Sequence, residues 1–97
     1  MIVRIVRMHF REDCAEKFLE IFQAHKVAIR NVEGCIRLEL LKDVNSPLVF
    51  TTLSHWKNAG HLEAYRNSDL FKDVWGRVKP LFSTQAQAFS LEKFIEV

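Results

Sequence analysis

One apolar stripe limits how this chain can fold more than any other feature of the sequence. Its members recur at three- and four-residue steps within residues 13–30: Phe18, Ile21, Phe22, His25, Ala28 and Ile29. This spacing is typical of an amphipathic helix, and Asp13 is expected to cap its start. The apolar runs on either side, 2–10 and 35–42, read as strands. A helix with one apolar face between two strands must bury that face against a sheet.

The second half of the chain shows strand and helix signals in a different order. Turn-forming residues at 43–47 precede a strand at 48–55, which predicts an antiparallel hairpin with 35–42. A helical pattern begins at Trp56, and the residues Asn67-Ser68-Asp69 offer the cap of a further helix. Pro80 should end that helix, and residues 82–95 form the last expected strand.

The resulting order, βαββααβ, predicts a ferredoxin-like α+β fold with one antiparallel sheet and its helices on one face. A chain of 97 residues has room for one core, so we expect a single domain over 1–97. The other sheet face would then be uncovered, and we expect it to hold apolar residues such as Val6, Met8, Phe10, Leu48 and Phe50. A second copy of the chain is the simplest cover, which predicts a homodimer built sheet against sheet.

Charge and hydropathy argue against several kinds of partner. The 14 Lys and Arg are interspersed with 12 Asp and Glu, giving a formal net charge of +2, so we do not expect nucleic-acid binding. No apolar run approaches the ~20 residues of a membrane span. Arg4 and Arg7 also interrupt the opening run that a signal peptide would need. We therefore expect a cytoplasmic protein without a membrane partner, in which Cys14 and Cys35 are reduced thiols.

Several short segments resemble the antibiotic biosynthesis monooxygenase family, and together they extend over almost the whole chain. They are Val32-Glu33-Gly34-Cys35 before the second strand, Ser54-His55-Trp56-Lys57 at the end of the third, and Ser68-Asp69-Leu70-Phe71-Lys72. The resemblance implies a dimeric α+β barrel with a pocket between sheet and helices in each subunit. For some members it also implies oxygen chemistry on quinol-like or anthrone-like aromatic compounds, without metal or flavin.

The chain departs from the family pattern at positions that bear on chemistry. Many members have a glutamate two residues before the tryptophan and a histidine nine residues after it, where this chain has Ser54 and Tyr65. The iron-ligating histidine of the haem-degrading branch corresponds to Trp75, and its pocket asparagine and tryptophan correspond to Val6 and Tyr65. An indole has no lone pair free to bind iron, so we do not expect haem degradation. No phosphate-binding loop or metal-ligand spacing is present, and no cofactor or metal is predicted.

The candidate site residues each have a structural alternative. His25 could accept a proton from a phenol or quinol, or it could simply bond a backbone carbonyl at the edge of the core. Trp56 could form a wall for a flat substrate or fill the core, and Tyr65 could donate to a substrate oxygen or to water. Arg4 could hold an oxyanion, or it could pair with an acid such as Glu39, which we favour.

The leading hypothesis is a cofactor-independent monooxygenase acting on a small quinol-like or anthrone-like aromatic compound. It assigns proton removal to His25 and hydrogen-bond donation to Tyr65. Trp56, Trp75 and Arg4 are the expected substrate-binding residues. The missing glutamate and histidine leave an alternative of a different class, which is a non-catalytic dimeric domain that binds a small ligand.

Overall fold

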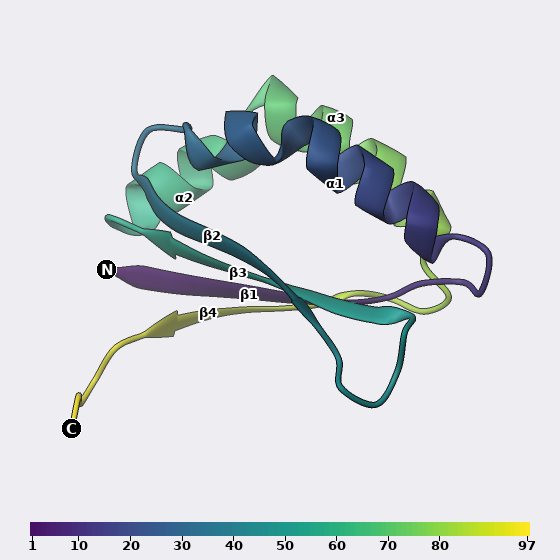
Figure 1. The fold of residues 1–97 in the computed structure, drawn as a ribbon. Coiled ribbons are helices and arrows are strands. Elements are labelled where there is room, and N and C mark those ends of the chain that lie inside the picture. Colours follow the sequence, from purple (N-terminus) through teal and green to yellow (C-terminus); the bar gives the residue numbers. More distant parts are fainter.

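The computed structural model describes residues 1–97 as one antiparallel sheet with helices on one of its faces (Figure 1). The strands lie in the order β2-β3-β1-β4, as in a ferredoxin-like α+β fold, and the predicted βαββααβ order is confirmed. In chain order the elements are β1 (Ile2–His9), α1 (Ala15–Arg30), β2 (Cys35–Lys42), β3 (Val49–Trp56), α2 (Ala59–Arg66), α3 (Asp69–Val78), the 3₁₀ helix η1 (Lys79–Leu81) and β4 (Gln87–Glu92).

Local capping explains where two of the three α-helices begin. Asn58 and Ser68 precede α2 and α3, and their side-chain oxygens accept backbone N–H groups of the first helical turn at 2.9 and 3.2 Å. The predicted cap of α1 is wrong, because the helix begins after Cys14 without a side-chain cap. The Asp13 carboxylate instead lies 3.4 Å from the Cys14 thiol, whose hydrogen it accepts.

The phase of the strands decides which side chains the helices bury. Met8 in β1 is 3% exposed, and Phe10 just beyond it is 1% exposed. Phe50 lies opposite Met8 in the β1–β3 ladder, so it points to the same face and joins the same core. Val6 shares this face and packs against that core. The expectation that these residues lie on the uncovered face is therefore wrong; Leu48, expected with them, lies before β3 begins.

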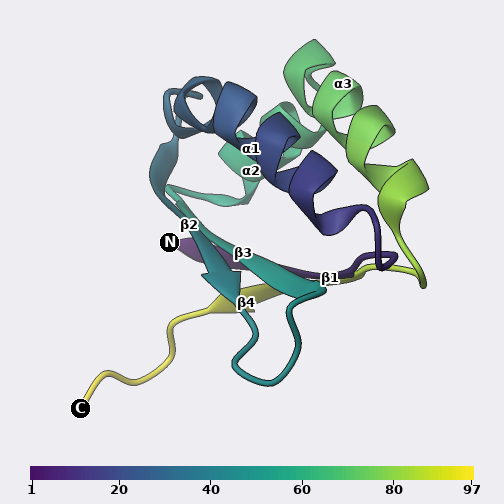
Figure 2. The same cartoon turned by 45° about the vertical axis from the view of Figure 1, so that its right-hand side comes forward.

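The main core lies between the sheet and the neighbouring helices α1 and α3, which run side by side (Figure 2). Phe10 stacks on Phe18 of the predicted α1 stripe with ring centroids 4.3 Å apart. A second, smaller cluster of Cys35, Trp56 and Leu62 lies beside α2. Because Trp56 pairs with Ile2 whereas Phe50 pairs with Met8, the two clusters occupy opposite ends of the strands.

The opposite face of the sheet carries no helix (Figure 1). The pairing register places there the apolar side chains of Val3, Ile5, Leu41, Leu53, Phe89 and Leu91. We call this surface the open sheet face. Phe89 and Leu91 are each 51% exposed, which is a large fraction for side chains of this kind.

The last strand is shorter than the predicted 82–95. β4 covers Gln87–Glu92, and Phe82 makes only an isolated bridge to Phe10. Every residue of β4 is exposed, because the strand forms the edge of the sheet and no helix packs closely on it. None of the helices combines the length and the apolar character that crossing a membrane would require.

Candidate functional site

Five aromatic side chains form a continuous row from the end of β3, through α2 and α3, to the segment before β4. In contact order they are Trp56, Tyr65, Phe71, Trp75 and Phe82, and successive ring centroids lie 5.0, 5.2, 5.9 and 5.5 Å apart. These separations fall in the range of favourable aromatic pairs. We call this set the aromatic row, and it contains three of the five predicted site residues.

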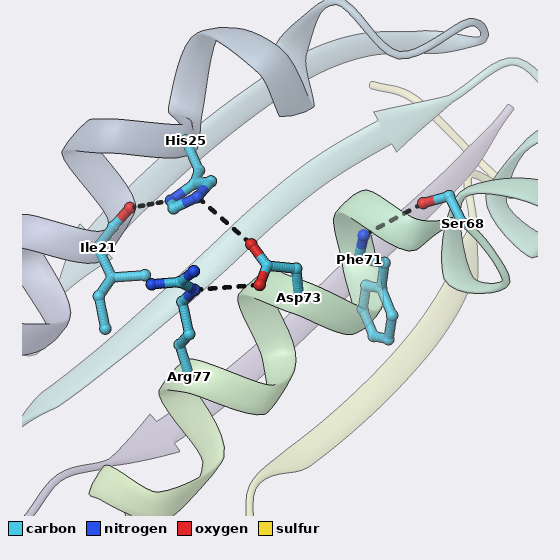
Figure 3. Close-up of polar contacts among 6 residues, drawn as sticks. All are labelled: Ile21, His25, Ser68, Phe71, Asp73 and Arg77. Atoms are coloured by element: carbon cyan, nitrogen blue, oxygen red, sulfur yellow. Dashed lines mark hydrogen bonds and ion pairs between the residues drawn. The ribbon is translucent and has the colours of Figure 1, made fainter.

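Ser68 holds together the two helices that carry the middle of the row. Its hydroxyl donates to the Tyr65 carbonyl oxygen at 2.6 Å and accepts the N–H of Phe71 at 3.2 Å; Figure 3 shows the second bond. One side chain therefore joins the end of α2 to the start of α3. Trp75 follows Phe71 by four residues on α3, which places it on the same face and lets the two rings stack at 11°.

The Trp56 end of the row is closed to solvent. Trp56 is 1% exposed, and its indole N–H donates to the Ser54 hydroxyl at 2.9 Å. Tyr65 stacks on it, and burial, with a smaller contribution from Cys35, raises the pKa of Tyr65 to about 12. The Tyr65 hydroxyl therefore keeps its proton at neutral pH and can donate a hydrogen bond.

Arg4 lies on the helix-facing side of β1. It donates to the Ser90 hydroxyl of β4 at 2.9 Å. Partial burial and then the neighbouring Arg66 lower its pKa, while Glu63 opposes that shift. The favoured ion pair with a strand acid is wrong, since Glu39 pairs with a neighbour on its own strand and no acid lies within ion-pair distance of Arg4. Arg4 is therefore a cation without a carboxylate partner.

His25 lies apart from the aromatic row, between α1 and α3 (Figure 3). Its Nδ1 is 2.7 Å from the Ile21 carbonyl oxygen, which can only accept, so Nδ1 carries the hydrogen in the neutral ring. Its Nε2 faces Asp73 of α3 at 3.9 Å, and Asp73 also accepts from Arg77 at 3.1 Å. The structure thus agrees with the alternative in which His25 bonds a backbone carbonyl. None of its polar contacts involves the aromatic row.

The row ends at a groove of about 590 Å³, which is a common size for a small-molecule site. We call it the Trp75 groove; its lining residues are Trp75, Lys79, Phe82, Ser83, Thr84, Gln85 and Ala86. A smaller groove of about 280 Å³ lies between α1 and β2. The His, Cys, Asp and Glu side chains nowhere gather in groups of three that could hold a metal ion. Cys14 and Cys35 are both free and buried.

Phe71, Phe82 and Lys79 were not among the residues predicted for the site. The four-residue step from Phe71 to Trp75 is a usable signal, because it places both rings on one face of α3. Lys79 follows Trp75 by the same four-residue step, whereas Phe82 reaches Trp75 only because the chain turns back toward the sheet after Pro80. Periodicity within a helix or a strand carries no information about that path.

The fold and the groove define an α+β domain with a small-molecule-sized site at one end of an aromatic row. The model of the antibiotic biosynthesis monooxygenase family matches residues 1–75, and the chain belongs to this family.

Solved structures with the same fold share little sequence with the chain. A conserved protein from Methanosarcina mazei Go1 is 20% identical with a TM-score of 0.90, over 97% of this chain and 94% of that one. An antibiotic biosynthesis monooxygenase is 13% identical with a TM-score of 0.91, over 98% and 100% of the two chains. Rv0793 from Mycobacterium tuberculosis is 17% identical with a TM-score of 0.90, over 98% and 96%. No curated protein matches the sequence.

Proposed function

We propose that this protein is a cofactor-independent monooxygenase that acts on a small quinol-like or anthrone-like aromatic compound. Membership of the family supports a monooxygenase-like role in general terms. The observation that supports the substrate class is the aromatic row, whose Trp75 end opens into the groove. A flat, electron-rich ring would contact the Trp75 and Phe82 side chains there.

In the proposed reaction the substrate itself supplies the electrons. Loss of a proton from an anthrone leaves an anion that passes one electron to O₂, and the two radicals combine to a peroxide. The CH₂ carbon becomes a carbonyl carbon: it gains one oxygen atom, and its two hydrogens leave as water with the other. The protein would hold the anion next to O₂ and stabilise its charge.

We assign separate roles to the predicted residues. Tyr65, with its pKa at about 12, is a neutral hydrogen-bond donor to the substrate oxygen, and the stacked Trp56 backs its ring. Of the predicted residues only Trp75 lines the groove, so it contacts the substrate ring. Tyr65 and Arg4, which has no acidic partner, meet the substrate oxygen only in a compound that extends from the groove along the aromatic row. His25 is the candidate base through Nε2, because Nδ1 already bonds a backbone carbonyl.

Oxygen consumption by the purified, metal-stripped protein tests the proposal, with reduced quinones and anthrones as substrates and boiled protein as control. We expect protein-dependent uptake of one O₂ per anthrone. Tyr65→Phe should slow uptake while ligand binding persists. His25→Ala should lower it by roughly 10²–10⁴-fold if Nε2 takes the proton in the rate-limiting step. No uptake with any member of the panel would contradict the proposal.

One observation favours a second candidate, a non-catalytic ligand-binding domain. His25 bonds to backbone between α1 and α3 and has no polar contact with the aromatic row, so the row has no identified base. This candidate predicts that aromatic ligands bind in the Trp75 groove and are released unchanged. Product analysis after long incubation separates the two candidates.

We also propose that the protein is a homodimer in which a second copy covers the open sheet face. The half-exposed Phe89 and Leu91 support this, because they are apolar, adjacent to other apolar side chains and not covered by any helix. Two such faces related by a two-fold axis can pack as a sheet-on-sheet interface.

A further inference from the structure

We infer that the Trp75 groove selects aromatic compounds that carry a negative charge, and that Lys79 is the residue that determines this selectivity. The inference rests on the proposed function, since it narrows the substrate class of the same site. It concerns binding, however, and can be tested without turnover.

The charge pattern of the groove supports an anionic ligand. Lys79 is the only charged residue among those that line it, and no carboxylate is present there. Lys79 takes part in none of the ion pairs of the chain, which all involve other residues. The side chains of Thr84 and Gln85, which also line the groove, make no hydrogen bond within the protein, so their O–H and N–H groups remain available. An anion in the groove would meet donors and a cation.

The walls of the groove support an aromatic ligand. The rings of Trp75 and Phe82 meet at 67° with centroids 5.5 Å apart, which forms a corner. A planar ring can stack on one wall and direct an edge at the other. Phe71 stacks on Trp75, and Phe10 of the core contacts Phe82 with ring centroids 5.4 Å apart, so both rings are held in place by further aromatic contacts. A preformed corner of this kind loses little conformational freedom on binding.

The backbone around Lys79 is equally well anchored. Val78 and Leu81 are both buried on either side of it, and Pro80 fixes the turn of η1 between them. Lys79 is therefore held at the rim of the groove by its neighbours, although its own side chain is exposed. A substitution there should change the charge of the groove without disturbing the core.

The test compares 2-naphthoate with its neutral analogue 2-naphthamide, using calorimetry or quenching of tryptophan fluorescence. We expect the protein to bind the carboxylate about three- to tenfold more tightly, as a partly exposed charge-assisted contact would give. Lys79→Gln should remove this preference and leave the affinity for the amide unchanged. Lys72→Gln is the matched control, because Lys72 is exposed on α3, the helix that leads into η1, forms no ion pair and does not line the groove.

Equal affinity for the two probes, a preference that survives Lys79→Gln, or binding of neither probe would overturn the inference. Oxygen uptake, measured separately, distinguishes its failure from that of the proposed function. Turnover of neutral quinols without a preference for naphthoate would contradict the inference but not the proposed function. A preference for naphthoate without any turnover would support the inference and contradict the proposed monooxygenase activity.

Discussion

Tyr65 is the only tyrosine of the chain, so its ionisation can be followed by absorbance without interference from other tyrosines. Burial raises its pKa from 10.0 to about 12. The folded state therefore holds this proton more tightly than the unfolded state, so the stabilisation is fully present below pH 10 and is lost as the pH rises toward 12. We expect a phenolate midpoint near 12 in the folded protein and near 10 in concentrated guanidinium. A midpoint near 10 while circular dichroism still reports a folded chain would contradict this.

Gly34 is the residue where an added methyl group should be most harmful. Its φ is +87°, and a Cβ there would overlap the His61 side chain, including Nδ1 at 2.7 Å. We expect Gly34→Ala to lower the free energy of unfolding by about 1–3 kcal/mol, through backbone strain and steric overlap. Gly76→Ala is the control, because an added Cβ there meets nothing within 4 Å, and it should stabilise α3 by about 0.5–1 kcal/mol. Urea unfolding measures both; equal midpoints for the two variants would refute the argument.

At the scale of the element, Ser68 tests how α2 and α3 are joined. Ser68→Ala removes the acceptor for the Phe71 N–H and the donor to the Tyr65 carbonyl, and should lower the free energy of unfolding by about 1 kcal/mol. Ser68→Asp keeps an acceptor at the helix start and places a negative charge near its N-terminus, which is favourable. We therefore expect the aspartate variant to unfold close to the wild type. If it is as unstable as the alanine variant, the bond to Tyr65 is the more important of the two.

The order of the elements could be predicted from the sequence, whereas the phase of β1 could not. Helical stripes and turn-forming residues mark where each element lies, and these signals are local. In β1, however, Val3 and Ile5 are apolar on one face and Val6 and Met8 are apolar on the other, so alternation does not distinguish the two sides. The choice is made by the helices that cover Met8, which are distant in sequence.

A bulge in β2 shows a second limit of predicting strand faces from the alternation of apolar and polar residues. Leu38 and Leu40 face the helices, and their alternation with charged residues predicted a half-buried strand correctly. Ile36 fits the same alternation, yet the register shifts between Cys35 and Arg37, so that Cys35 is buried and Ile36 is 43% exposed. One extra residue in a strand moves the side chains that precede it to the opposite faces of the sheet.

Individual residues of the candidate site could be predicted from the sequence, but their arrangement in space could not. Trp56, Tyr65 and Trp75 were expected to act at one site, and the structure joins them in the aromatic row through Phe71. His25 was expected to act with them because it lies on the apolar stripe of α1. That stripe faces two neighbours, the sheet and α3, and His25 meets α3. A helical pattern identifies a buried face without identifying what covers it.

At the scale of the whole molecule, the open sheet face is the feature that a single chain leaves unexplained. A domain of this size buries only a little over about 60% of its unfolded surface, so further cover for apolar side chains is a substantial gain. Phe89, in the edge strand β4, lies opposite Ile5 in the register and, at 51% exposed, is among the most exposed apolar side chains of this face. Its environment should therefore change most when two sheets meet.

We accordingly expect sedimentation at micromolar concentration to give about twice the chain mass. Phe89→Asp should yield a monomer, because a carboxylate buried between two apolar sheets would lose its hydration without gaining a partner. Val44→Asp is the matched control: Val44 is 94% exposed in the turn between β2 and β3, outside the open sheet face, so this variant should remain dimeric. A monomeric wild type would exclude the dimer. A dimer that persists in Phe89→Asp would instead place the interface on another surface.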